Sequence, residues 1–133
     1  MGSETVLVVE DNAPLRRLTE RMLQRQGYHV LVASNGEEAR RISEEFQGPI
    51  PVVLMDVIMP GESGPSIGDW ICRTRAETKI VYTSGYTGFA DDHDRVARSG
   101  TVFLQKPFSV VQLVSAIRSL LPESGAADAG VKR

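Results

Sequence analysis

The stretch that decides the fold is Pro51-Val52-Val53-Leu54-Met55-Asp56-Val57-Ile58-Met59-Pro60. The apolar run before Asp56 is too short, and too rich in β-branched residues at its centre, for a helix. It predicts a buried strand that ends on a carboxylate. Two other apolar runs end on charge in the same way: Val6–Val9 leads into Glu10-Asp11, and residues 102–105 lead into Lys106.

Strand-like runs alternate along the whole chain with segments of helical periodicity. Strands are expected at 6–9, 29–33, 51–55, 79–83 and 101–105. Helices are expected to follow Asn12, Asn35 and Pro65, then as a weak polar segment around Val96 and Ala97, and last from Val110 to Leu121. Five βα units in series predict an α/β domain whose mostly parallel sheet is covered by helices on both faces.

Apolar spacing suggests which helix faces are buried. In the first helix, Leu15, Leu18 and Met22 fall at i, i+3 and i+7, and Gly27 supplies a natural stop. The other predicted inner faces are formed by Ala39, Ile42 and Phe46, by Ile67, Trp70 and Ile71, and by Val110, Leu113, Val114, Ile117, Leu120 and Leu121.

Composition narrows the class of protein. The 133 residues suit a single domain with a real core, and a net charge of −2 gives no indication of nucleic acid or an anionic membrane as partner. Cys72 is the only cysteine, which excludes an internal disulfide and fits a reducing compartment. Without a membrane-length apolar run or a secretory leader, we expect a cytoplasmic domain. Residues 122–133 have little to bury and predict a disordered tail or linker.

The charged residues at the strand ends predict a chemical site. If the carboxyl ends of three parallel strands converge, Glu10, Asp11, Asp56 and Lys106 share one crevice. Three acids together repel one another, and a hard divalent cation such as Mg²⁺ relieves that repulsion. A phosphoryl-accepting, metal-dependent site explains this collection of groups.

Each residue also has a plainer explanation. Asp56 could simply begin a turn, and Asp11 could favour the dipole of the helix that follows it. Lys106 could be a solvated lysine at a strand end. However, the chain has 12 Arg and only three Lys, so a lysine at this position suggests that a compact ammonium group is required there.

Four segments resemble the receiver domain of two-component response regulators, above all receivers attached to hybrid sensor histidine kinases. They are Val6–Asn12, Leu54–Gly61, Tyr82–Tyr86 and Phe103–Phe108, and the resemblance spans about residues 4–121. It implies a flavodoxin-like (βα)5 doubly wound parallel sheet with strand order 2-1-3-4-5.

The resemblance also implies a role for each site residue. Asp56 would be the phosphoacceptor and, with Asp11, a direct Mg²⁺ ligand. Glu10 would bind the metal directly or through water, and the main-chain carbonyl of Ile58 would complete the protein ligands. Lys106 would pair with Asp56 at rest and with a phosphoryl oxygen afterwards. Pro107 would occupy the family's cis-proline position.

Two further positions would change state on phosphorylation. Ser84 lies 22 residues before Lys106, as the family spacing requires of the switch hydroxyl, while the adjacent Thr83 is the rival. Phe103 takes the place of the rotating aromatic residue, although a plain core phenylalanine explains it nearly as well.

The function expected from the resemblance is a phosphorelay module that takes a phosphoryl group from a histidine kinase or histidine phosphotransfer protein. It would switch a protein-binding surface, with no nucleic-acid or membrane contact and with a weak homodimer allowed. The partner would dock on the rim formed by Pro14, Leu15, Pro107 and Phe108. One rival function is an Asp-nucleophile phosphohydrolase, but Ile58 stands where such enzymes usually carry a second aspartate. Another is a pseudo-receiver that binds its partner constitutively.

The same residues predict a long-lived phosphorylated form. Family receivers that hydrolyse quickly tend to place small or polar side chains two residues after the acceptor and two after the switch hydroxyl. Here those positions hold Ile58, which cannot orient water, and Tyr86, which can cover its approach. We expect Tyr86→Ala to accelerate decay of the phosphorylated form, measured by intact mass over time. A wild-type lifetime of seconds, or equal decay in the variant, contradicts this prediction. With Thr83 as the switch residue, Gly85 would leave the approach open.

Overall fold

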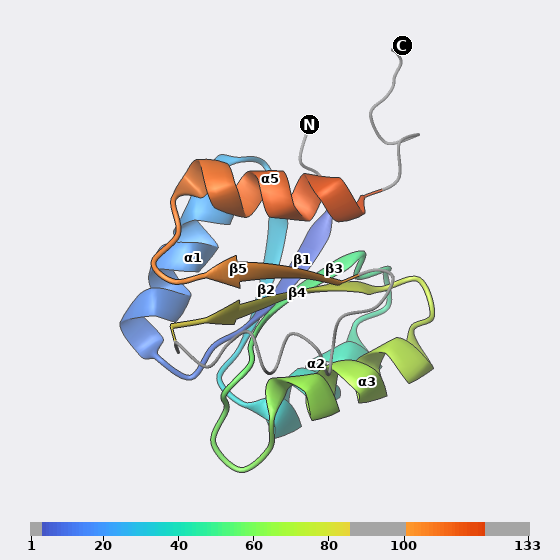
Figure 1. Ribbon diagram of the computed structural model, residues 1–133. Coiled ribbons are helices and arrows are strands. Elements are labelled where there is room, and N and C mark those ends of the chain that lie inside the picture. Colours follow the sequence, from blue (N-terminus) through green and yellow to red (C-terminus); the bar gives the residue numbers. More distant parts are fainter. Residues whose placement is uncertain (1–3, 86–100, 122–133) are drawn as a thin grey trace.

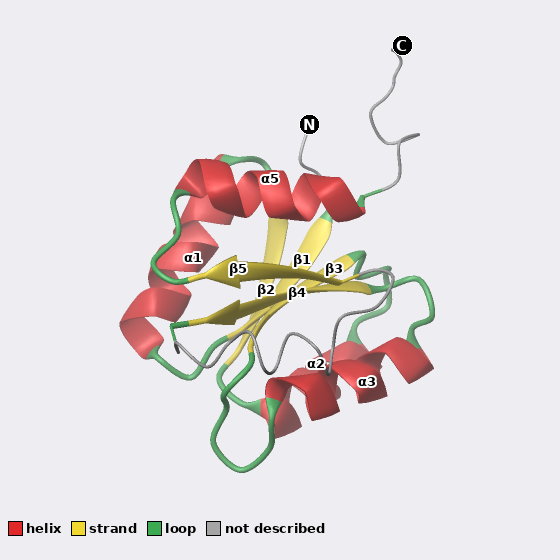
Figure 2. Ribbon diagram, in the orientation of Figure 1, coloured by secondary structure: helices red, strands yellow, loops and turns green. Residues whose placement is uncertain are grey.

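A computed structural model describes residues 4–85 and 101–121, and it forms a five-stranded parallel sheet (Figures 1 and 2). The strand order is β2-β1-β3-β4-β5, which confirms the expected doubly wound topology. The strands are β1 (Thr5–Val9), β2 (His29–Ala33), β3 (Val52–Asp56), β4 (Lys79–Ser84) and β5 (Thr101–Gln105). The sheet therefore agrees with the predicted runs to within a residue or two, β4 including Ser84 as its last residue.

Helices cover both faces of this sheet. In Figure 1, α1 (Ala13–Arg25) and α5 (Val110–Leu120) lie on one face, while α2 (Gly36–Glu45) and α3 (Gly64–Thr74) lie on the other. Alternate strand residues therefore enter two separate cores, because successive side chains point to opposite faces. In β1, for example, Val6 and Val8 join the α1–α5 core, whereas Leu7 and Val9 join the α2–α3 core.

Side-chain caps fix where each described helix begins. Asn12 and Asn35 accept hydrogen bonds from the N–H groups of Leu15 and Glu38 at 2.9 and 2.8 Å, as expected of N-cap asparagines. At the other end of α1, Gly27 adopts a φ of 93°, a conformation that glycine reaches without strain. The Asn12 cap also ends the short loop that carries Glu10 and Asp11.

The predicted inner face of α1 is wrong at one position. Leu18 is 55% exposed, and the buried residues of this helix are Thr19 and Leu23. Successive helix residues are rotated by about 100°, so the i, i+4 pair at 19 and 23 shifts the buried stripe away from position 18. Leu18 instead projects from the molecular surface.

Some predictions concern residues that the structure leaves undescribed. The expected helix around Val96 and Ala97, Tyr86, and the tail at 122–133 all lie outside the described residues. Within residues 4–85 and 101–121, no helix combines the length and the apolar character that crossing a bilayer requires.

A close backbone approach joins α3 to the end of β3. A Cβ atom at Gly64 would lie 2.1 Å from the main-chain oxygen of Asp56, and the Gly64 N–H donates to the Val57 carbonyl at 2.8 Å. Only glycine leaves room for this contact. The first turn of α3 thus rests directly on the peptide that carries Asp56.

We expect Gly64→Ala to lower the free energy of unfolding by roughly 1–3 kcal/mol, because the added methyl group must push backbone away from backbone. Urea denaturation measures the loss. Gly85→Ala is the matched control, since a Cβ there meets only the Lys106 Cβ at an ordinary 3.9 Å. Equal stability of the two variants would show that the contact at Gly64 is not restrictive.

Candidate functional site

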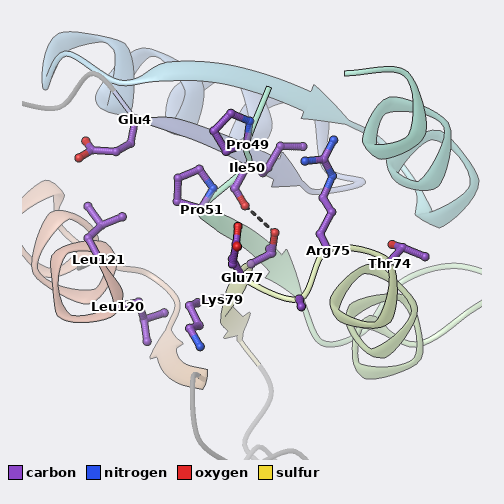
Figure 3. A pocket seen from close by; sticks show the side chains of 12 residues that line it. Glu4, Pro49, Ile50, Pro51, Thr74, Arg75, Glu77, Lys79, Leu120 and Leu121 are labelled. Carbon is purple, nitrogen blue, oxygen red and sulfur yellow. Dashed lines mark hydrogen bonds between the residues drawn. The ribbon is translucent and has the colours of Figure 1, made fainter. Parts of the chain in front are cut away.

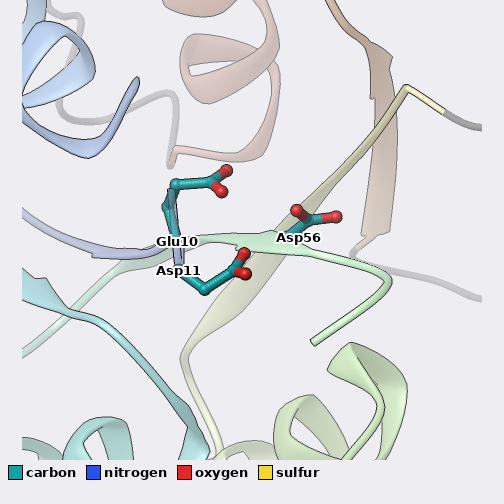
Figure 4. Close-up of side chains that lie close together, drawn as sticks. All are labelled: Glu10, Asp11 and Asp56. Carbon is teal, nitrogen blue, oxygen red and sulfur yellow. The ribbon is translucent and has the colours of Figure 1, made fainter. Parts of the chain in front are cut away.

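Three carboxylates meet at the carboxyl ends of two neighbouring strands (Figure 4). Asp56 is the last residue of β3, and Glu10 and Asp11 directly follow β1, which pairs with β3. One oxygen from each acid lies within 4.8 Å of the others. Glu10 and Asp56 are only 5% and 9% exposed, whereas Asp11 is exposed. The sequence correctly predicted that these acids come together.

Lys106 closes the site from β5. Its Nζ atom donates to Asp56 Oδ2 at 2.8 Å and to Glu10 Oε1 at 2.9 Å. The backbone is tied as well, because the Lys106 N–H donates to the Ser84 carbonyl at 2.9 Å and the Lys106–Pro107 peptide is cis, as the resemblance implied. Burial alone would lower the pKa of Lys106, but the hydrogen bonds and charges of Asp56 and Glu10 outweigh it and raise the pKa above its usual value.

Glu10 is the most constrained of the acids. Burial raises the pKa of its carboxyl, and the negative charge of Asp56 adds to that rise. The hydrogen bonds from Lys106 and from the Asn12 N–H, the latter 3.0 Å from Oε2, oppose it. With both oxygens engaged, Glu10 has less freedom than Asp11 to turn toward an additional ligand.

The segment after Asp56 is anchored at both ends. The Ile58 N–H donates to Asp56 Oδ1 at 3.2 Å, which orients the carboxylate, while the Ile58 side chain is 56% exposed. Further along, Glu62 forms an ion pair with Arg40 of α2 and accepts a hydrogen bond from the Ser66 hydroxyl at 2.7 Å. These contacts fix the loop that presents Asp56.

Both candidate switch hydroxyls are buried at the end of β4. Thr83 is the direct ladder partner of Asp56, and Ser84 pairs with Gln105 of β5 while accepting from Lys106 through its carbonyl. Both residues therefore lie on backbone next to the acids. The choice of Ser84 over Thr83 stays a prediction that rests on the spacing to Lys106.

Phe103 packs against the α2–α3 core. Its ring lies 5.7 Å from that of its ladder partner Tyr82, measured between centroids. The Tyr82 hydroxyl in turn lies against α3, where a Cβ at Gly68 would come within 2.2 Å of it. This position suits a core residue, and the switch role of Phe103 stays a prediction.

Sequence reasoning missed one contact of the site. Arg16, in α1, donates from Nη1 to the main-chain oxygen of Glu10 at 2.8 Å. Nothing in the sequence distinguishes Arg16 from the other arginines of the chain, because the contact depends on how α1 turns back over the end of β1.

A groove of the described region lies away from these acids. This groove of about 620 Å³ opens at the amino ends of the strands, opposite the acids (Figure 3). Its wall includes Glu4, Pro51 and Lys79, which precede or begin β1, β3 and β4, together with Leu120 and Leu121 at the end of α5. None of the three clustered acids lines it, so this groove is separate from the acidic site.

Comparison with known proteins identifies the family. The sequence pattern described as "Response regulator receiver domain" matches residues 6–118. The chain is 38% identical over 120 residues to the sensor kinase CckA of Brucella abortus (strain 2308), covering 90% of this chain but only 13% of that kinase. It is 31% identical to the response regulator receiver protein CpdR of the same strain, covering 87% of this chain and 95% of CpdR.

A solved structure gives the same result. The receiver domain of the hybrid histidine kinase CckA superposes with a TM-score of 0.70 at 32% identity, covering 89% of this chain and 99% of that domain. The resemblance inferred from the strand ends is therefore confirmed. The chain belongs to the response regulator receiver domain family of two-component signalling systems.

Proposed function

We propose that the domain, extending over residues 4–121, accepts a phosphoryl group from a phosphohistidine onto Asp56 and thereby switches a protein-binding surface. One observation carries this proposal: the Asp56 carboxylate is hydrogen-bonded to the Lys106 ammonium and flanked by Glu10 and Asp11 at the carboxyl ends of β3 and β1. A buried ion pair alone would need only one acid for one lysine. The two additional acids are best explained by a cation that the site is built to receive.

The residues present suit Mg²⁺. Three carboxylates against one ammonium leave the cluster with negative charge, and all the ligands are hard oxygens. Asp11 and Asp56 would coordinate directly with the Ile58 carbonyl, while Glu10, already bonded to Lys106 and Asn12, suits contact through water. When bound, Mg²⁺ would neutralise charge on the phosphoryl group being transferred.

The arrangement of these groups supports one transfer step. An oxygen of Asp56 attacks phosphorus, the bond from phosphorus to the donor imidazole nitrogen breaks, and an aspartyl phosphate remains. Lys106 then exchanges its bond to Asp56 for one to a phosphoryl oxygen, and its ammonium group offsets the charge that develops there. Ser84 would donate its hydroxyl to the same group, and Phe103 would follow it.

The rival functions fit less well. A phosphohydrolase needs an acid or base near the leaving group, and the side chain of Ile58 offers neither. A constitutive binding module does not explain why Lys106 and all three acids are present together. Direct phosphorylation separates these possibilities.

The partner surface is proposed to lie across α1 and α5, where a helix of a histidine kinase or phosphotransfer protein would dock. Of the expected rim, Pro14 and Pro107 are exposed, whereas Phe108 packs partly against the α1–α5 core. Two further apolar side chains project from these helices: Leu18 on α1, 55% exposed, and Val111 on α5, 74% exposed. Such exposed leucine and valine side chains suit a helical partner.

We predict that Asp56→Asn abolishes phosphorylation but leaves the fold intact, because the amide is nearly isosteric and removes one of three crowded charges. Intact mass after incubation with acetyl phosphate and Mg²⁺ is the measurement. Asp69→Asn, which changes an aspartate on α3 away from the cluster, should label like wild type. A full phosphate adduct on the Asp56→Asn protein would contradict the assignment of Asp56 as the phosphoacceptor.

Mg²⁺ is expected to bind weakly and to be required for labelling, since few protein ligands hold an ion that keeps several waters. Millimolar Mg²⁺ should raise the melting temperature of the wild type, because the ion binds only the folded state. The same titration of Asp11→Asn should show a much smaller rise. An absent shift in the wild type, together with labelling in EDTA, would contradict the site.

Replacing Leu18 and Val111 together by alanine should slow transfer from a cognate phosphohistidine donor by about tenfold, in the range expected for interface residues. Labelling by acetyl phosphate should not change, because both side chains project into solvent. Equal loss with both donors would indicate damage to the site rather than to docking, and unchanged transfer would exclude this surface.

A further inference from the structure

The turn between β1 and α1 is held by an unusually complete set of hydrogen bonds around Glu10. Its N–H donates to the Ala33 carbonyl at 3.0 Å, and its side-chain oxygens accept from Lys106 and the Asn12 N–H. Its main-chain oxygen accepts from Arg16 Nη1 at 2.8 Å. Every polar group of Glu10 therefore forms a hydrogen bond, as expected of a residue that is only 5% exposed.

The bond from Arg16 acts on the peptide that leads into Asp11. The Glu10 carbonyl belongs to the Glu10–Asp11 peptide, whose orientation determines where the Asp11 carboxylate points. Asp11 itself is exposed, so little packing holds its side chain. Its aim toward Glu10 and Asp56 (Figure 4) depends on the backbone on either side, which Arg16 fixes before it and the Asn12 cap fixes after it.

We propose that Arg16 is a positioning residue of the metal site, which holds the Glu10–Asp11 peptide so that Asp11 faces Asp56. This inference rests on the proposed Mg²⁺ function of the cluster. Contacts that orient metal ligands without touching the metal commonly change affinity by tenfold or more. Arg16 reaches back over six residues and over the first turn of its own helix to make this one.

Because Arg16 is positively charged, an electrostatic role and a positioning role predict opposite changes in Mg²⁺ affinity when it is replaced. A guanidinium near the site repels a divalent cation, so removing the charge should strengthen Mg²⁺ binding if electrostatics were its main effect. A positioning role predicts the opposite result, weaker binding. A nearby acid partly balances this arginine: Glu38 of α2 accepts from the N–H and hydroxyl of Ser34, and those bonds lower the pKa of its carboxyl, with smaller contributions from the charges of Arg41 and Arg16.

The experiment compares Mg²⁺ dissociation constants, obtained from the melting temperature across a Mg²⁺ titration, for wild type, Arg16→Met, Arg16→Lys and Arg17→Met. Arg17 is the exposed neighbour on α1, so its replacement removes the same charge from the same helix without touching the bond to Glu10. We expect the dissociation constant to rise about tenfold in Arg16→Met, to recover in part in Arg16→Lys, and to stay equal or fall slightly in Arg17→Met. The metal-free melting temperature reports any general loss of stability separately.

Each outcome has a definite meaning. Unchanged or tighter Mg²⁺ binding by Arg16→Met overturns the positioning role, and equal weakening in Arg17→Met does so as well. Should Arg16→Met fail to fold, the comparison of Arg16→Lys with Arg17→Lys decides, because both keep the charge and only the first alters the bond to Glu10. A wild type that binds no Mg²⁺ would instead contradict the proposed function itself.

Discussion

Three clustered carboxylates, two of them bonded to the Lys106 ammonium group, make the strictest demand on the fold. Like charges at such short separation raise the free energy of the folded state unless a cation lies among them. Lys106 supplies one positive charge, bonded to both Asp56 and Glu10, and a bound Mg²⁺ would supply the rest. The cluster therefore keeps a net negative charge, which a divalent cation would offset.

The fold provides the rigidity that this arrangement requires. Asp56 ends a strand that is buried along its whole length, and the paired strands on either side end at nearly the same level. The loops that follow are tied down independently, by Arg16 after β1, by Gly64 and Glu62 after β3, and by the Ser84 carbonyl before Lys106. Glu10 and Asp56, which would repel each other in a flexible loop, are thus kept within hydrogen-bonding distance of Lys106.

The two faces of the sheet carry different parts of the proposed function. The helices α1 and α5 cover one face (Figure 1), and they carry the exposed side chains of Leu18 and Val111, where we propose that a partner docks. On the opposite face, Phe103 and Tyr82 pack together against the α2–α3 core. A conformational change at the end of β4 or β5 would therefore move side chains on both faces, since adjacent residues of a strand point to opposite sides.

The sequence by itself determined the fold class, the family and the identity of the clustered groups. The apolar runs that end on Glu10, Asp56 and Lys106 place these groups together, because parallel strands separated by helices bring their carboxyl ends to one side of the sheet. The family follows from the resemblance of the four motif segments. The sequence also predicted the helix cap at Asn12 and the helix end at Gly27, since both depend on local backbone chemistry.

Only the tertiary structure decided how those groups are held and which surfaces remain open. Leu18 fitted an inner face by spacing yet is exposed, because the buried stripe of α1 is set by the rotation of the whole helix against β1 and β2. Two contacts join elements through backbone atoms: the bond from Arg16 to Glu10 and the approach of Gly64 to Asp56. Because every residue has the same backbone atoms, the sequence does not indicate such contacts. Spacing along a chain predicts which residues share an edge, whereas the distances between their atoms follow from how the packed helices turn.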